Sequence, residues 1–301
     1  MPTRRDFLAA CSAATLCIPK PTQAAGPKAL ANKLGITTSS VGSQLAGRGK
    51  PKNFTLLELP HILNNEFGFE VIDLNTSSLA STKKSYLDKL RKATDDAGCI
   101  LTNLKMNQRN LKMGSIDKDA RSLALSEYKK SIDVAAHLGL RWARPLPRAE
   151  KPDRKTYVAS YQELAKYAAE KEVTMLVENF GWMQNDSESV VKLIKEVGDN
   201  VEACPDTGNW DSKQLRIDGL KKTFPIAVTC DFKARKLGPK GEHPLYDLKQ
   251  CFEIGWQAGF RGPWCFEHAN TDTNALFREL NLLGNMLRDW TKLSDQAKTP
   301  R

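Results

Sequence analysis

The sequence predicts a single (β/α)8 TIM barrel of the α/β class, preceded by an export signal. From residue 34 onward, short apolar runs alternate with longer segments of helical period, which is typical of parallel strands joined by helices. Four of these runs end in a carboxylate, a group that a core cannot bury unpaired. No linker rich in glycine, serine or proline divides residues 30–293, so we expect one domain.

The first 25 residues differ from the rest. They begin with the paired arginines Arg4 and Arg5, continue with a short apolar region over residues 7–18 and end in small residues suited to cleavage. This pattern is typical of a twin-arginine export signal. The apolar region is too short to span a bilayer, so we expect no integral membrane span and a periplasmic or otherwise extracytoplasmic location. We assign residues 1–25 to the signal and 26–301 to the barrel.

The alternation contains eight strands and eight helices. The expected strands cover residues 34–38, 69–74, 100–105, 140–146, 174–178, 201–206, 226–231 and 262–267. The expected helices cover residues 55–67, 82–97, 117–138, 154–171, 187–197, 212–223, 246–258 and 273–293. A doubly wound open sheet would share this alternation, but it would place a glycine-rich phosphate motif after the first strand. The glycines of residues 39–50 have neither of the two motif spacings, so nucleotide binding is not expected.

The composition excludes several classes of protein. A hydrophobic content of 41% and a charged content of 27% are ordinary for a globular enzyme. The net charge of +10 would permit a nucleic-acid partner, but the basic residues are interleaved with acids along helices, so we expect none. The cysteines outside the signal form a poor pattern for disulfides or zinc, because their number is odd and no two are closely spaced: Cys99, Cys204, Cys230, Cys251 and Cys265. Three of them, Cys204, Cys230 and Cys265, lie inside expected strands and are predicted to be small buried residues.

Carboxylates close the last four apolar runs: Glu178, Asp206, Asp231 and Glu267. Parallel strands of a barrel deliver such residues to one face, which is where the active sites of these barrels lie. Four acids at one place would repel one another, and at least one would take up a proton unless a cation neutralised them. The pattern therefore predicts a divalent-metal site.

Four motifs resemble those of a known family. VENFGW (177–182), CPDTGNW (204–210), CDFKAR (230–235) and CFEH (265–268) resemble the strand-five to strand-eight motifs of the xylose isomerase-like barrels. These include sugar and sugar-phosphate isomerases and epimerases and, more distantly, endonuclease IV. The resemblance implies that the four carboxylates are the metal ligands, and that Glu178 and Glu267 are also the acid/base pair. Asp231 stands where the family usually has a histidine.

An all-oxygen ligand set favours Mn²⁺ or Mg²⁺ over Zn²⁺. Alternatively, Asp231 binds Lys233 or Arg235 and leaves a site of three ligands. The structural alternative for Glu178 and Glu267 is a pair of salt bridges with Lys233, Arg235 or Arg144, which we regard as the weaker interpretation because acids at this face of a barrel are costly unless used.

Further residues are expected to contact the substrate: Lys233, Arg235, Asn209, Trp182 and Arg144. Lys233 matches the family's lysine. Asn209 could instead cap a helix, and Trp182 could instead pack in the core, although aromatic rings often stack on sugars. Lys105 and Asp73, at the ends of the third and second strands, are further candidates.

The leading functional hypothesis is a metal-dependent sugar isomerase or epimerase that transfers a proton beside a carbonyl. A 3-oxo-glycoside lyase could use the same metal and base. A non-catalytic carbohydrate-binding barrel with a degenerate metal site is the third hypothesis. A nuclease of the endonuclease IV type is disfavoured, because that class uses a histidine-rich zinc cluster and this chain has four histidines. The expected partner is a small carbohydrate, and the chain could form a homo-oligomer.

Overall fold

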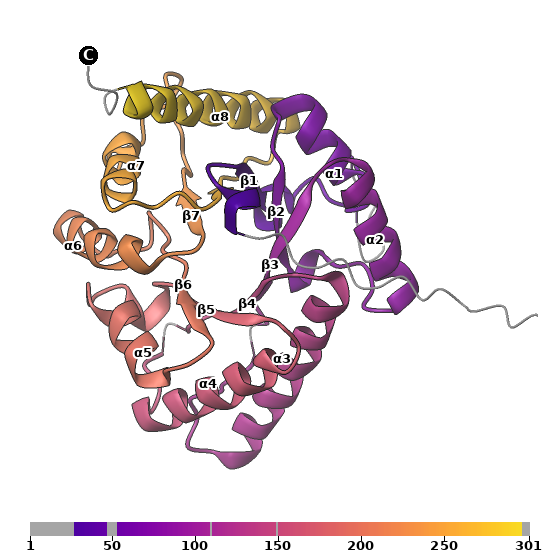
Figure 1. Cartoon of the computed structure of the whole chain (residues 1–301), viewed down its shortest axis with the longest axis vertical. Coiled ribbons are helices and arrows are strands. Elements are labelled where there is room, and N and C mark those ends of the chain that lie inside the picture. Colours follow the sequence, from indigo (N-terminus) through magenta and orange to yellow (C-terminus); the bar gives the residue numbers. More distant parts are fainter. Residues whose placement is uncertain (1–26, 47–52, 109, 149, 297–301) are drawn as a thin grey trace, which may run out of the picture.

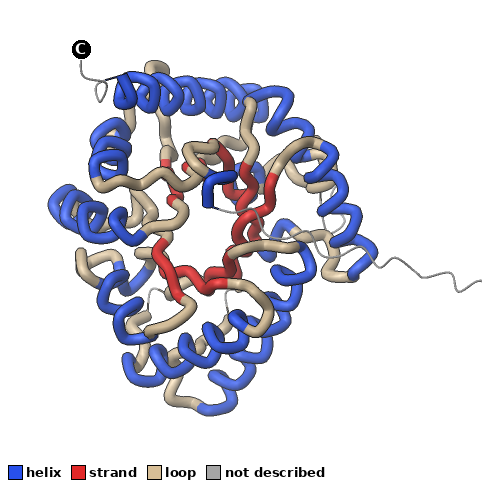
Figure 2. The backbone as a smooth tube through the Cα atoms, in the orientation of Figure 1, coloured by secondary structure: helices blue, strands red, loops and turns tan. Residues whose placement is uncertain are grey.

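A computed structural model describes residues 27–46, 53–108, 110–148 and 150–296. Within these ranges, eight parallel strands form one curled sheet in the order β6-β5-β4-β3-β2-β1-β8-β7. The helices lie outside the ring of strands (Figures 1 and 2), so the predicted (β/α)8 TIM barrel is confirmed. The expected export signal, residues 1–25, lies outside the described residues. None of the described helices is long and apolar enough to cross a membrane.

The elements follow the expected order closely. The strands are β1 Leu34–Thr37, β2 Val71–Asn75, β3 Ile100–Met106, β4 Trp142–Pro145, β5 Thr174–Val177, β6 Val201–Ala203, β7 Cys230–Lys233 and β8 Trp264–Glu267. The α-helices are α1 Leu59–Ile62, α2 Lys84–Asp96, α3 Lys118–Leu138, α4 Arg154–Ala169, α5 Ser189–Val197, α6 Lys213–Thr223, α7 Leu248–Gln257 and α8 Thr273–Gln296. Short 3-10 helices complete the fold: η1 Pro27–Leu30, η2 Thr38–Val41, η4 Thr76–Ser78, η5 Gly181–Met183 and η6 Phe224–Ile226. The π-helix η3 Leu63–Phe67 continues α1, so the first expected helix begins four residues later than predicted.

Local sequence explains where the helices begin. Asp117, Asp153, Ser212 and Asp247 precede α3, α4, α6 and α7, and the side chain of each accepts a backbone N–H of the first turn. Such caps satisfy donors that a helix start leaves without partners. At the other end of α3, Gly139 adopts the left-handed conformation (φ 72°) that a glycine enters without strain.

The seventh strand differs from the prediction. It was expected over residues 226–231, but it begins at Cys230, because Pro225 lies in the turn η6 and the chain becomes regular only four residues after that turn. Asp231 is therefore the second residue of β7 and does not end the strand. The sixth strand is also shorter than expected, because Pro205 cannot donate to a ladder.

Isolated bridges close the barrel between β6 and β7. They pair Ala203 with Ala227 and Asp206 with Asp231. The Asp231 amide donates to Pro205 O at 2.9 Å, and the Thr207 amide donates to Asp231 O at 3.0 Å. The seam thus sets two of the predicted metal ligands directly opposite each other.

The core has two parts. The larger lies between the strands and the surrounding helices, and it includes alternate strand residues such as Ile72 and Leu74 of β2. The smaller cluster lies inside the barrel and consists of Leu30, Val71, Trp142, Leu176, Cys204 and Cys265. Leu30 comes from the turn that enters β1, so it covers the amino-terminal end of the barrel. All five described cysteines are buried and free, and the predicted burial of Cys204, Cys230 and Cys265 is confirmed.

Candidate active site

A charged layer lies above the apolar floor of the barrel. At five positions around the barrel, in a strand or just after it, the residue two places after a floor residue is ionisable. Side chains two apart on a strand share a face, so each of these groups points into the barrel on the side of the strands' carboxyl ends. The pairs are Val71 and Asp73, Trp142 and Arg144, Leu176 and Glu178, Cys204 and Asp206, and Cys265 and Glu267.

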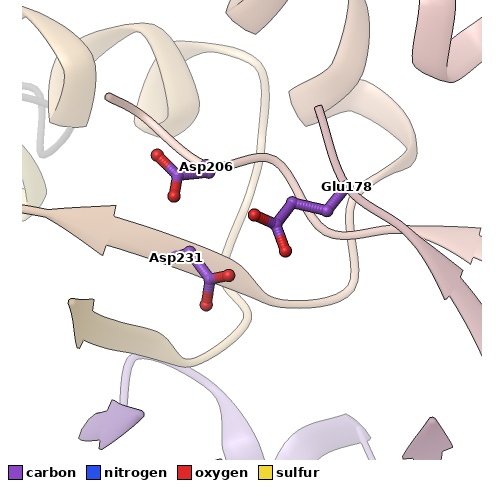
Figure 3. A group of neighbouring side chains, drawn as sticks. All are labelled: Glu178, Asp206 and Asp231. Atoms are coloured by element: carbon purple, nitrogen blue, oxygen red, sulfur yellow. The ribbon is translucent and has the colours of Figure 1, made fainter. Parts of the chain in front are cut away.

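Three carboxylates of this layer lie together. Glu178, Asp206 and Asp231 each offer an oxygen, and these oxygens lie within 4.8 Å of one another. Figure 3 shows them reaching one space from three separate segments of the chain. All three are at most 2% exposed. Three of the four predicted metal ligands are therefore brought together, and Glu267 is not among the residues of this group in the described chain.

Asp206 is fixed by its own turn. Its Oδ1 accepts from the amides of Gly208 at 2.7 Å and Asn209 at 3.0 Å. Asn179 holds the backbone on the other side, donating to Asp206 O at 3.0 Å and accepting from its amide at 2.8 Å. A Cβ on Gly208 would lie 2.5 Å from Lys233 Cδ, so the absence of a side chain at Gly208 leaves room for the Lys233 side chain. The Lys233 ammonium lies 3.2 Å from Asp206 Oδ2.

Glu178 lies between an amide and a guanidinium. Its Oε1 accepts from Asn209 Nδ2 at 3.0 Å. Arg144 Nε lies 2.8 Å from its Oε2, close enough for an ion pair but without hydrogen-bond geometry. Asn209 also accepts from Lys233 Nζ at 2.6 Å. Asn209 therefore links Glu178 to Lys233, and Arg144, expected to bind substrate, pairs with Glu178.

Asp231 pairs with Lys105 across the barrel. The Lys105 ammonium donates to Asp231 Oδ1, and both side chains are buried. The other oxygen, Oδ2, has no hydrogen-bond partner in the described chain. The carboxylate of Asp73, whose Oδ1 accepts from Thr102 at 2.6 Å, also helps to raise the pKa of Lys105 through its charge. The cation that engages Asp231 is thus Lys105, and not Lys233 or Arg235 as the sequence-based alternative proposed.

Glu267 stands at the more open edge of the layer, with its side chain 14% exposed. Its Oε1 accepts from Arg235 Nη2 at 2.6 Å and lies 3.3 Å from Lys233 Nζ. Both cations approach the same oxygen. Lys233 therefore bridges Asp206 and Glu267, while Arg235, half exposed, reaches Glu267 from outside.

The charges of this layer do not balance. Five carboxylates, those of Asp73, Glu178, Asp206, Asp231 and Glu267, face three largely buried cations, Lys105, Arg144 and Lys233. If all are ionised, two negative charges remain in excess among these buried groups, or one when the half-exposed Arg235 that pairs with Glu267 is counted, and a divalent cation would offset this excess. Glu178 Oε2 and Asp231 Oδ2 also lack hydrogen-bond partners within the described residues. This donor set fits a hard divalent cation.

The pKa values of the buried carboxyl groups also reflect the excess of negative charge. Burial raises the pKa of Asp206 to about 8, although Lys233 opposes the shift. Burial raises the pKa of Asp73 to about 6 against the charge of Lys105, and it also raises the pKa of Glu178. For Glu267, burial is outweighed by Lys233, Lys105 and Arg235, which together lower its pKa to about 2. Without a cation, the layer therefore holds protons.

These shifts predict how stability depends on pH. Above about pH 4, the unfolded chain has released the protons of Asp73 and Asp206, while the folded chain keeps them up to about pH 6 and 8. The folded state then binds more protons, so we expect the free energy of unfolding of the metal-free protein to fall between pH 5 and pH 8. Glu267 acts in the opposite sense, but only below its unfolded pKa of about 4.3.

Urea unfolding in a chelator at pH 5 and pH 8 measures this decline. Adding Mg²⁺ should reduce it, because a bound cation replaces the protons, and roughly one proton should be released per ion bound at pH 7. Metal-free protein that is more stable at pH 8 than at pH 5 would contradict the prediction.

Trp182 lies outside the acidic group. It packs edge-on against Tyr157 of α4, with ring centroids 5.6 Å apart, and Arg154 covers it at 5.3 Å.

The sequence-based prediction missed the role of Asn179, which a buried asparagine directly after a strand could have indicated. It also missed Tyr157 and Arg148, which line a cavity beside Trp182; no pattern in the sequence singles them out.

Fold and site together define a (β/α)8 barrel with an acidic cluster at the carboxyl ends of its strands. The chain belongs to the xylose isomerase-like TIM barrel family, whose model matches residues 64–283. A search of curated proteins finds none that matches this sequence.

Several solved structures share the fold at low sequence identity. A D-psicose 3-epimerase with D-tagatose from Clostridium cellulolyticum H10 is 17% identical, with a TM-score of 0.68 over 85% of this chain and 98% of that one. A xylose isomerase-like TIM barrel protein from Mycobacterium smegmatis in complex with magnesium is 16% identical, with 0.64 over 91% and 100%. A 3-keto-D-glucoside 4-epimerase from E. coli is 15% identical, with 0.66 over 86% and 99%.

Proposed function

We propose that this protein is a metal-dependent sugar isomerase or epimerase that transfers a proton at the carbon beside a carbonyl. The observation that carries the proposal is a pair of glutamates: Glu178, a member of the three-carboxylate group, and Glu267, which Lys233 links to Asp206 of that group. The pKa of Glu178 is raised and that of Glu267 is lowered. Two carboxyl groups whose pKa values are displaced in opposite directions are suited to an acid and a base. The similar folds of the D-psicose 3-epimerase and the 3-keto-D-glucoside 4-epimerase support the same class of reaction.

Glu178, Asp206 and Asp231 would hold the cation, and we propose Mg²⁺ or Mn²⁺ because all three offer carboxylate oxygens. The fold shared with a magnesium complex supports this choice. When bound, such a cation stabilises the negative charge that develops on the substrate oxygen. Glu267 is not needed to form this group and remains available for the substrate.

The residues around the three-carboxylate group have separate roles in proton transfer and in positioning. Glu267 is held by Lys233 and Arg235 through Oε1, and we assign proton transfer to its other oxygen, Oε2. Lys233 also contacts Asp206 and Asn209, so one ammonium fixes the distance between the base and the cluster. Arg144 and Asn209 orient Glu178, which exchanges the proton on the opposite side of the substrate carbon.

The lyase hypothesis uses the same groups. Removal of the proton beside a 3-oxo group could be followed by loss of the aglycone instead of return of the proton. The cavity of about 450 Å³ beside Trp182 offers room for a second group, which favours this alternative specifically. Incubation of the metal-loaded protein with ketoses and with 3-oxo-glycosides in D₂O, followed by NMR, separates the two reactions. An epimerase returns a deuterated sugar, whereas a lyase releases the aglycone.

A non-catalytic carbohydrate-binding barrel is the remaining hypothesis. It is favoured by the two ion pairs, Lys105 with Asp231 and Arg144 with Glu178, because each already neutralises one carboxylate. The excess of negative charge among the buried groups favours metal binding instead.

Metal binding is expected to raise the melting temperature. A ligand that binds only the folded state at about 100 times its Kd stabilises it by about 2.7 kcal/mol. For a chain of 301 residues, with an unfolding entropy of about 2.1 cal/mol/K per residue, that is a shift of roughly 4 °C. Differential scanning calorimetry with and without Mg²⁺ or Mn²⁺ measures the shift, with Na⁺ at equal ionic strength as the control. An unchanged melting temperature with both metals would favour the non-catalytic barrel.

A further inference from the structure

The cavity beside Trp182 has a volume of about 450 Å³, and none of the residues of the acidic group lines it. Its walls come from the chain after β3 (residues 111–116), the chain after β4 (residues 146, 148 and 150–153) and three aromatic rings. The rings belong to Tyr128 of α3, Tyr157 of α4 and Trp182 of η5. Segments that follow barrel strands at their carboxyl ends carry the substrate contacts of this fold. The cavity is therefore on the functional face.

Three side chains of this cavity have donors without acceptors. They are Tyr157 Oη, Trp182 Nε1 and the Nε and Nη2 atoms of Arg148, all buried and without a hydrogen-bond partner in the described chain. Tyr157 is only 4% exposed. Indole and guanidinium groups can only donate. A buried donor without an acceptor destabilises the folded state, so a cluster of them indicates a missing acceptor.

The acids of the cavity wall are engaged elsewhere. Asp153 caps α4 by accepting from the Thr156 amide at 2.8 Å. Glu150 lies 3.7 Å from Lys112 Nζ. Arg148 forms no ion pair with any carboxylate of the described residues. The charge that would complement its guanidinium is thus not supplied by the described chain.

The free atoms of Arg148 favour an oxyanion. Nε and Nη2 lie on one edge of the guanidinium, and two parallel N–H groups on such an edge match a carboxylate or a phosphate. The Tyr128 hydroxyl lies beside the same guanidinium. Trp182 is held between Tyr157 and Arg154, which fixes the direction of its indole N–H. The site is therefore built in advance and does not depend on a flexible surface side chain.

Short stretches of chain connect the cavity to the acidic group. Arg148 follows Arg144 by four residues, and Trp182 follows Glu178 by four. The Arg144 guanidinium, paired with Glu178, also acts electrostatically on the hydroxyls of Tyr128 and Tyr157. A substrate whose reacting carbon lies at the acidic group could therefore place a second group here.

We propose that the cavity formed by Arg148, Tyr157 and Trp182 binds a carboxylate or phosphate group carried by the substrate, away from its reacting carbon. The assignment of the occupant to the substrate rests on the proposed function. The binding of an oxyanion does not, because it requires neither the metal nor turnover.

Binding to the full chain tests the proposal. The probes are D-glucuronate and inorganic phosphate, with neutral D-glucose as the control, each followed by calorimetry and by Trp fluorescence. We expect at least one anion to bind in the millimolar range or tighter and glucose to bind at least about tenfold more weakly. Binding of glucuronate alone identifies a sugar acid, and binding of phosphate alone identifies a phosphorylated substrate. No binding of either anion above that of glucose overturns the proposal.

Three variants localise the site. Arg148→Met should weaken anion binding about tenfold or more, because an ion pair with two hydrogen bonds is lost. Arg278→Met removes an exposed arginine of α8 and should change nothing. Tyr157→Phe removes only the unpartnered hydroxyl, so it should weaken anion binding severalfold while the ligand-free melting temperature stays the same or rises. Unchanged anion affinity in both Arg148→Met and Tyr157→Phe overturns the proposal.

A metal titration separates this proposal from the proposed function. The rise in melting temperature with Mg²⁺ should be the same in Tyr157→Phe as in the wild type. Anion binding without a metal response would support the oxyanion site and contradict the metal-dependent reaction. A metal response without anion binding would contradict the oxyanion site and leave the metal-dependent reaction supported.

Discussion

Glu178→Gln is expected to lower kcat for proton exchange by roughly 10³-fold, within the range that a positioned acid or base contributes. Glutamine keeps an oxygen to accept from Asn209 Nδ2, so the fold around the site should persist. It cannot carry the proton, and it removes one negative charge from the group that would hold the cation. Steady-state kinetics at saturating metal, with circular dichroism to verify folding, measures the effect.

The matched control is Glu163→Gln. Glu163 lies on α4, half exposed, where it pairs with Lys129 at 2.7 Å, and such surface pairs contribute little. Its kcat should equal that of the wild type. If Glu178→Gln kept a kcat within about threefold of the wild type, far above the effect expected for an acid or base, the assignment of Glu178 would be wrong.

Lys105→Met is expected to destabilise the metal-free protein by about 3–5 kcal/mol, because removal of one partner leaves a buried charge uncompensated. Lys105 is 2% exposed and is the cation paired with Asp231, with Asp73 also within its electrostatic reach. Its loss also frees Asp231 Oδ1, so we expect the affinity for Mg²⁺ to rise. Urea unfolding in a chelator and calorimetric titration of Mg²⁺ measure the two effects.

A double-mutant cycle isolates the pair. Asp231→Asn in the Lys105→Met background should recover part of the lost stability, since the uncompensated carboxylate is gone. Lys129→Met, which removes a surface partner of Glu163, should cost at most about 1 kcal/mol. A Lys105→Met protein as stable as the wild type, with unchanged Mg²⁺ affinity, would show that Lys105 does not compensate Asp231.

The sequence predicts the barrel well because its signals are local. The strands are short, largely buried runs of three to seven residues, and four of the helices start with caps that need only neighbouring residues. The errors occur where proline interrupts the pattern. Pro205 ends β6 early, and the turn at Pro225 delays β7 to Cys230. Both prolines lie within or next to apolar stretches of the sequence, so hydrophobic pattern alone does not reveal these shifted strand ends.

The candidate site is predicted less completely, because its contacts are distant in sequence. The order of the strands brings Glu178, Asp206 and Asp231 to one face, and this much follows from the fold. The pairing of Lys105 with Asp231 joins residues 126 positions apart and depends on how the barrel closes between β6 and β7. The separation of Glu267 from the group of three depends on Lys233 and Arg235, whose side-chain directions no sequence pattern specifies.

Hydrogen–deuterium exchange at the carbon beside a sugar carbonyl is the most direct test of the proposed reaction. The wild-type protein in D₂O, saturated with Mg²⁺ or Mn²⁺ and supplied with ketoses and 3-oxo-glycosides, should incorporate deuterium at that carbon, and addition of a chelator should stop the incorporation. No incorporation with either substrate class at full metal occupancy would contradict proton transfer by Glu178 and Glu267.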